Sequence, residues 1–329
     1  MSEYSHTKVT RWINLTGTPS PNGLKDLWGQ SWFLDQGQRL GRTYTAFEQR
    51  WFAYRNVKDA VTHKSHIQTI IMPFAQEQIQ DKLKDICLSL NAADYFDIMV
   101  PIITPVYVDL PPVARKIYKD MEKKMFMEIE DQTIKAFNAA SCTNKCLQIA
   151  NGAAYLDNDV NDDNLLRAKD WKVVHDMKLD ALDSIIEEAS GMPVIVAYNF
   201  KSDLARLKKA YPKGRHLNTK KDEDDFKAGL IDVLFVHPAS AGHGIDGFQY
   251  ITNIIVFFGM TWNLENYLQI IERIGPVRQI QAGFNRNVFV YHIIARNTVD
   301  EDVLERLETK RSVQDILLEA LKHRGAGND

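Results

Sequence analysis

The stretch IDVLFVHPASAGHGIDGFQYITNIIVFFG (residues 231–259) contains two apolar runs separated by a loop rich in small residues. Both runs are continuous rather than alternating, which is typical of parallel strands buried on both faces. Two similar runs flank the stretch, MPVIVAY (residues 192–198) and NVFVYHIIA (residues 287–295), and helical patterns separate the runs. We therefore predict an α/β fold with a parallel sheet covered by helices on both faces.

The rest of the chain has a different pattern. Residues 102–188 read as a short strand, VYVDLPP, followed mainly by helices. The first hundred residues contain the apolar WINL (residues 12–15), predicted as a short strand, a turn-rich TGTPSPNGL, and helical spacing around residues 47–54 and 76–90. The length suggests about two domains, and we predict residues 1–101 and 102–329.

Composition limits the class of protein. Of 329 residues, 45% are hydrophobic and 25% charged, as in ordinary globular proteins. Three cysteines are too few for a disulfide scaffold, and MSEYSHTKVTRW (residues 1–12) lacks the apolar region of a signal peptide, so we expect a cytoplasmic protein. The net charge of −3 neither requires nor excludes a nucleic-acid partner.

Two loops have the composition of phosphate-binding segments. In LTGTP (residues 15–19), backbone N–H groups and threonine hydroxyls follow a predicted strand, although an ordinary Pro/Gly turn has the same residues. In HPASAGHGIDGF (residues 237–248), small residues allow close approach to phosphate, and Ser240 can donate to it. Gly242, Gly244 and Gly247 match G-x-G-x-x-G, but a strand rather than a helix follows, so a dinucleotide fingerprint is disfavoured.

A pair of arginines follows in LENYLQIIERIGPVRQ. Gln269 and Arg273 are four residues apart and share one helix face, and Gly275-Pro276 then ends the helix and leaves Arg278 at its exit. Two such arginines suit a transferring phosphoryl group, but a solvated surface pair would look the same. The basic segment 201–221 is similarly open to two interpretations: it binds a nucleic-acid backbone, or it forms a solvated helix face.

The sequence has no G-x-x-x-x-G-K-[ST], and no apolar strand in it ends in an Asp-Glu pair. Those two motifs hold ATP and its Mg²⁺ in phosphate-loop ATPases. Cys142 and Cys146 form one helical pair without further ligands, so we predict no structural metal site.

Taken together and in this order, the segments resemble the Swi/Snf-type helicase-like ATPases of superfamily two, in the form found in tailed bacteriophages. The segments are LTGTP, a helical insertion, PVIVAYNFKSDLARL, HPASAGHGID and WNLENYLQIIERIGPVRQ, with phage-type KCLQIANGAAY and TVDEDVLERLETKRSVQDILLEALK. The resemblance implies two RecA-like lobes that clamp ATP. This chain would hold the end of the first lobe, with motif III, and the whole second lobe.

The resemblance also implies roles for single residues. The motif III residues Thr16, Gly17, Thr18 and Pro19, with Gly244 and Asp246 of motif V, would couple the nucleotide to the DNA strand. Ser240 and Gly242 of motif V, and Asn199 and Lys201 at the motif IV position, would contact DNA.

Motif VI would supply the catalytic residues. Gln269 matches its start, Arg273 would act as a finger on the γ-phosphate, and Arg278 matches its second arginine. The family usually spaces these arginines three apart, whereas here they are five apart around Gly275-Pro276.

The function predicted is therefore the C-terminal half of a DNA-dependent ATPase. Its cofactors would be ATP and Mg²⁺, held mainly by an N-terminal half that carries the P-loop. DNA and that half would be its partners, in the host cytoplasm if the gene is phage-encoded. Two alternatives stay open: a binding module that hydrolyses nothing, and an inactive remnant.

Overall fold

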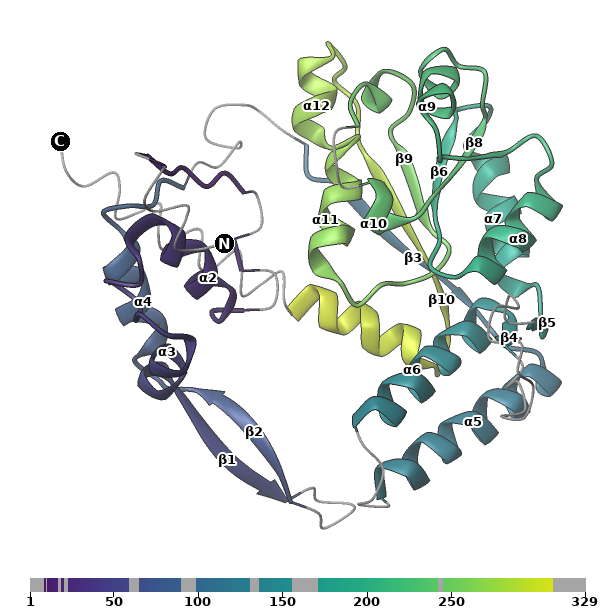
Figure 1. Cartoon of the computed structure of the whole chain (residues 1–329). Helices are drawn as coiled ribbons and strands as arrows, with labels where there is room; N and C mark the ends of the chain where they lie inside the picture. The colour runs from purple at the N-terminus through teal and green to yellow at the C-terminus, as the bar shows by residue number, and fades with distance from the viewer. Residues whose placement is uncertain are drawn as a thin grey trace, which may run out of the picture. The chain divides into compact units, whose positions relative to one another are not determined.

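The computed structural model (Figure 1) describes residues 9, 11–16, 19–20, 23–58, 65–89, 99–130, 136–155, 171–241 and 245–309. For residues 56–58, 65–68, 124–130 and 136–142 it describes the backbone alone. The chain divides into two compact units. The smaller comprises Met1–Asp94 with Leu307–Asp329, and the larger is Tyr95–Arg306.

The larger unit is built on a sheet of six parallel strands in the order β3-β10-β9-β6-β8-β7. Its strands are β3 (Ile102–Val108), β6 (Val194–Ala197), β7 (Arg215–His216), β8 (Val233–Val236), β9 (Ile254–Phe257) and β10 (Phe289–Ala295). Every residue of β6, β8 and β9 is buried, which explains why their sequences are continuously apolar. The predicted parallel sheet is confirmed.

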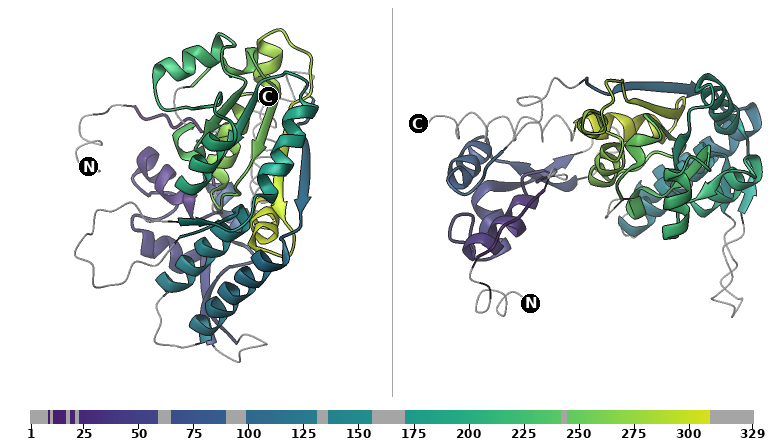
Figure 2. Two further views of the ribbon diagram at one scale, coloured as in Figure 1. Left: turned by 90° about the vertical axis from the view of Figure 1, so that its right-hand side faces the viewer. Right: turned by 90° about the horizontal axis from the view of Figure 1, so that it is seen from above.

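Helices lie on both sides of this sheet (Figures 1 and 2). Helices α7 (Met177–Glu188) and α8 (Lys201–Ala210) lie on one side and α11 (Leu264–Glu272) on the other. The remaining elements are α9 (Lys220–Lys227), α10 (Pro238–Ala241), η2 (Phe248–Tyr250), α12 (Pro276–Gln281) and a helix over residues 299–309. This is the α/β arrangement predicted for a second RecA-like lobe. None of the described helices is long and apolar enough to cross a membrane.

The predicted helical insertion is also present in the larger unit. Helix α5 (Pro112–Glu130) packs against α6 (Ala136–Asn151), and Pro112 begins α5, where a proline loses no hydrogen bond. The antiparallel strands β4 (Ala153–Tyr155) and β5 (Trp171–Val173) follow.

Buried polar groups join the insertion to the sheet and its helices. The Lys178 ammonium lies 2.6 Å from an Asp300 oxygen, and both side chains are fully buried. Lys178 also donates to Asn151 Oδ1 (2.8 Å), and Asn151 Nδ2 donates to Asp203 Oδ2 (2.9 Å). Arg206 donates to the Asn151 carbonyl (2.5 Å). Helices α6, α7 and α8 and the segment after β10 are therefore held by one network.

The smaller unit has a separate core. Helices α2 (Asp26–Asp35), α3 (Tyr44–Trp51) and α4 (Ala75–Leu83) surround a cluster of buried apolar side chains. The members of this cluster are Leu24, Leu27, Leu40, Phe47, Trp51, Phe52, Ala75, Ile79 and Leu83. The Thr43 hydroxyl caps α3 by accepting from the Ala46 N–H (3.2 Å), which sets the start of that helix.

Two predictions in the smaller unit were wrong. Residues 12–15 are not paired as a strand, and Ile13 and Leu15 are 72% and 91% exposed. The helix predicted through residue 54 ends at Trp51, and the antiparallel pair β1 (Phe52–Lys58) and β2 (Ser65–Ile71) follows. Helical spacing of Phe47 and Trp51 masked the strand propensity of FAYRNVK and SHIQTII.

Replacing Lys178 tests the buried network. We expect Lys178→Met to lower the free energy of unfolding by about 3–5 kcal/mol, because it leaves the Asp300 carboxylate buried without its cation. Urea denaturation of the full chain measures the change.

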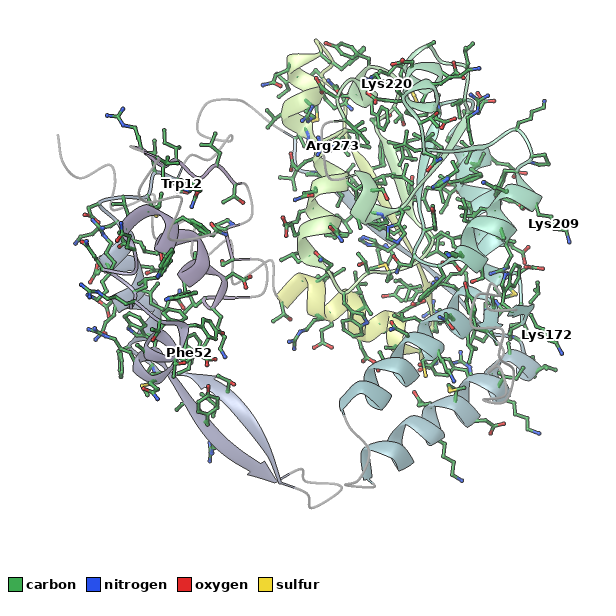
Figure 3. All side chains as sticks on the ribbon, viewed as in Figure 1. Trp12, Phe52, Lys172, Lys209, Lys220 and Arg273 are labelled. Atoms are coloured by element: carbon green, nitrogen blue, oxygen red, sulfur yellow. The ribbon has the colours of Figure 1, made fainter. Side chains whose placement is uncertain are left out.

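Lys172→Met is the matched control, because Lys172 is exposed on β5 and points outward in Figure 3. We expect this control to lie within about 0.5 kcal/mol of wild type. Equal losses for the two variants would contradict a structural role for the Lys178–Asp300 pair.

Candidate functional site

The loop between β8 and β9 contains the predicted motif V residues. After β8, the short helix α10 contains Ser240, whose side chain is exposed. Gly242 and Gly244 lie outside the described residues. The described chain resumes at Ile245 and leads through Asp246 and Gly247 to η2. Gly247 has φ of +96°, a conformation that a residue with a side chain rarely adopts.

Arg273 is attached to this loop by its side chain. It follows directly after α11, and its Nη1 donates to the Ile245 carbonyl (2.8 Å). The side chain is half-buried, and burial together with the nearby Arg278 charge lowers the pKa of Arg273 below its ordinary value. An arginine remains protonated at neutral pH under such a shift, so the site holds a partly desolvated positive charge.

Arg278 reaches the same loop from a second helix. Gly275 precedes α12 and Pro276 begins it, so the chain starts a new helix between the two arginines. Arg278 Nη1 forms an ion pair with Asp246 Oδ1. Burial raises the pKa of Asp246, but hydrogen bonds from Gln249 and the Gly247 N–H and the charge of Arg278 outweigh it and lower the pKa. The five-residue spacing therefore still brings both arginines to one loop.

Two residues missed by the sequence interpretation, Gln279 and Arg286, hold this arrangement. Gln279 is buried, and its Nε2 donates to the carbonyls of Thr252 and Ile274 (both 3.0 Å). Arg286 donates to Gln279 Oε1 (2.8 Å) and to the Gln249 carbonyl (2.9 Å). Most of these acceptors are backbone carbonyls, which leave no signal in the sequence.

Gln269 lies on α11, one turn before Arg273, and donates to Glu265 Oε1 (2.9 Å). None of the described contacts joins its side chain to Ile245 or Asp246. The structure thus brings Arg273, Arg278 and Asp246 together and places Gln269 beside them on the same helix.

The residues predicted at the motif IV position follow β6, which lies beside β8 in the sheet. Asn199 donates to the Met260 carbonyl, and Lys201 is exposed at the start of α8. Asp203 accepts from the N–H groups of Asn199 (3.3 Å) and Phe200 (3.0 Å). Burial raises the pKa of Asp203 to about 6. This carboxylate, also missed from sequence, anchors the turn that presents Asn199 and Lys201.

The residues predicted as motif III belong to the smaller unit. Thr16 is exposed, and the Pro19 carbonyl accepts from Gln30 Nε2 (2.8 Å). Gly17 and Thr18 lie outside the described residues. Among the residues that the structure describes, no group of three or more His, Cys, Asp or Glu could hold a metal ion.

No protein-family model matches the sequence. The chain is 51% identical over 325 residues to putative protein p41 of Acyrthosiphon pisum secondary endosymbiont phage 1, covering 98% of this chain and 68% of p41. It is 23% identical to the chromatin-remodeling ATPase INO80 of Lodderomyces elongisporus, a match covering 94% of this chain and 21% of that protein.

Two solved structures are similar at a TM-score of 0.47 each. The Sulfolobus solfataricus SWI2/SNF2 ATPase core in complex with dsDNA is 23% identical, with 94% of this chain and 63% of that chain covered. The C-terminal part of the Fun30 ATPase domain is 15% identical, with 69% of this chain and 99% of that chain covered.

Replacing Gln279 tests the support of the arginine loop. We expect Gln279→Ala to lower the free energy of unfolding by about 2–4 kcal/mol, because two buried carbonyls lose their donor and Arg286 loses an acceptor. Thermal or urea denaturation measures the loss.

Gln281→Ala is the control on the same helix, since Gln281 is exposed. A loss for Gln279→Ala no larger than for this control would contradict the assigned role.

Proposed function

We propose that this chain, which belongs to the phage-type Swi/Snf family of helicase-like ATPases together with protein p41, supplies the arginine-bearing second lobe of a DNA-dependent ATPase. In this proposal residues 102–329 form that lobe and residues 1–101 the end of the first. An N-terminal half with the P-loop would hold ATP and Mg²⁺. The activity would take place in the host cytoplasm.

The observation behind the proposal is the pair of guanidinium groups at one loop. Arg273 directly follows α11 and Arg278 lies on α12, yet they bond to adjacent residues, Ile245 and Asp246. The charge of Arg278 is close enough to lower the pKa of Arg273. A bound phosphate would offset this repulsion, and the planar guanidinium matches the geometry of phosphate oxygens.

The chemistry assigned to the arginines is electrostatic. Negative charge spreads over the oxygens of a transferring γ-phosphoryl group, and a positioned arginine stabilises that charge without taking a proton. Arg273 is the finger in this assignment, because its side chain is oriented by the Ile245 carbonyl and half-buried. Arg278, held by Asp246, adds a second positive charge, and Gln269 occupies the adjacent turn of α11.

The same loop offers a route from nucleotide to DNA. Ser240, Asn199 and Lys201 follow the adjacent strands β8 and β6, and we assign them to the DNA backbone, with Gly242. The loop continues from Ser240 through Gly244 to Asp246, which contacts Arg278. A change in the phosphates of the bound nucleotide would therefore move the DNA-contacting residues through this one short segment. Backbone contacts of this kind predict low sequence specificity and strong salt dependence.

The exposure of segment 11–16 supports the proposal that this chain assembles with a partner half. Its apolar pattern is that of a buried strand, yet Ile13 and Leu15 are largely exposed and make no sheet pairing among the described residues. A sheet supplied by the first lobe would cover both side chains and satisfy the backbone. Thr16, Gly17, Thr18 and Pro19 follow this segment and would then lie at the end of a paired strand, where we assign them to coupling.

A second candidate function is that of a binding module, which binds nucleic acid and does not hydrolyse ATP. The exposed Lys201, Lys208 and Lys209 on α8 favour it. DNA binding that is unaffected by ATP and by the P-loop half would support this function.

Replacing Arg273 tests the finger assignment. In an assembly of this chain with its P-loop half, we expect Arg273→Ala to reduce kcat for ATP hydrolysis by about 10³–10⁵. Arg273→Lys should also lose most activity, because an ammonium does not match the planar fork. Arg296→Ala is the control, since Arg296 is exposed at the end of β10. Turnover at the wild-type rate in Arg273→Ala would remove the assignment.

Replacing Leu15 tests the docking segment. We expect Leu15→Asp to leave the stability of the free chain within about 0.5 kcal/mol of wild type, because the side chain is exposed. The same change should weaken assembly with the P-loop half, because it would bury a charge. Analytical ultracentrifugation of the mixture measures assembly. Undiminished assembly would show that segment 11–16 does not dock.

A further inference from the structure

The β1–β2 ribbon of the smaller unit has an anchored root and an exposed far part. Phe52 at the root is buried, its ring lies 5.5 Å from that of Phe47, and the Met72 N–H donates to the Trp51 carbonyl (3.0 Å). Beyond the root, Tyr54 is 57% exposed and Arg55 and Thr69 are exposed. Figure 1 shows the two strands extending away from α3 and α4. A lone two-stranded ribbon is marginally stable in water, so a role in binding would explain its presence.

The ribbon differs in charge from the helices of its own unit. The strands FAYRNVK and SHIQTII contain Arg55, Lys58 and His66 and no acidic residue. In the helical part of the unit, two cations are paired with carboxylates: Lys25 with Glu48 (2.5 Å), and Arg39 with Asp35 (3.2 Å) and Asp85 (2.5 Å). Within the described residues, no carboxylate pairs with Arg55. The charge of Arg55 is therefore available for an anionic partner.

The dimensions of the ribbon suit duplex DNA. Strands of this length span roughly 20 Å, and the major groove, about 12 Å wide, admits a two-stranded ribbon. The register places Asn56 and Lys58 on one face, and Arg55 opposite Gln68 on the other. Amide and guanidinium groups bond to base edges and phosphates.

We propose that the β1–β2 ribbon enters the major groove of duplex DNA and forms a second DNA contact, separate from the one assigned to Asn199, Lys201 and Ser240. This inference takes its class of partner from the proposed function. The ribbon contact needs no bound nucleotide and no arginine finger. The ribbon proposal can therefore fail while the ATPase assignment holds, and the ATPase assignment can fail while the ribbon proposal holds. The competing explanation is that the ribbon's charges only prevent its open edges from pairing with other strands.

Salt-dependent binding of the full chain to a fluorescent duplex, and to one of its single strands, tests the proposal. The variant is Arg55→Ala with Lys58→Ala. The matched control is Arg42→Ala with Lys84→Ala, which removes two exposed cations from the same unit outside the ribbon. Losing two phosphate contacts should make the slope of log K against log salt shallower by about 2 for the duplex. The single strand and the control should keep the slope of the wild type.

An unchanged duplex slope in the ribbon variant would overturn the proposal, as would an equal change in the control. Self-association of the ribbon variant with an unchanged slope would favour the edge-protection explanation. If the variant fails to fold, hydrogen exchange on the wild-type chain tests the proposal instead. Duplex DNA should slow exchange of amides in residues 52–58 and 65–71, and unaltered exchange there would overturn the proposal.

Discussion

Parallel pairing of short, fully buried strands is the constraint on which the larger unit depends. Because β6, β8 and β9 are apolar on both faces, they can only be central, with helices on either side. Their order then decides which loops become neighbours. Asn199 and Lys201 follow β6. The β8–β9 loop contains Ser240 and further along brings Ile245 and Asp246 to Arg273 and Arg278.

Polar groups convert this scaffold into a defined site. Gln279 and Arg286 tie the segment before β9 to α12, and Arg273 ties the end of α11 to Ile245. Two of these bonds join a side chain to a backbone carbonyl of another segment, and the third joins the Arg286 and Gln279 side chains. Asp203 has the corresponding role for the turn after β6. In our proposal the β8–β9 loop therefore serves both nucleotide and DNA, the turn after β6 serves DNA, and both are attached to one sheet.

The sequence predicted the parts that depend on local pattern. The parallel strands, the helical insertion and the residues Arg273, Arg278 and Asp246 were identified from apolar runs and motif order. Contacts between distant residues could not be predicted, because the bonds of Gln279 and Arg286 go mainly to backbone carbonyls. The β1–β2 ribbon was missed because Phe47 and Trp51 continue a helical spacing up to the point where the strand begins. The segment 12–15 has the pattern of a strand but no sheet to join among the described residues.

We propose above that this chain completes an ATPase whose P-loop is on another half. DNA-stimulated ATP hydrolysis, measured for the purified chain alone, for the P-loop half alone and for their mixture, tests it most directly. We expect the mixture to hydrolyse ATP at a rate that duplex DNA increases, and neither half alone to hydrolyse ATP above background. Equal hydrolysis by the P-loop half with and without this chain would contradict the account and leave a nucleic-acid-binding module in its place.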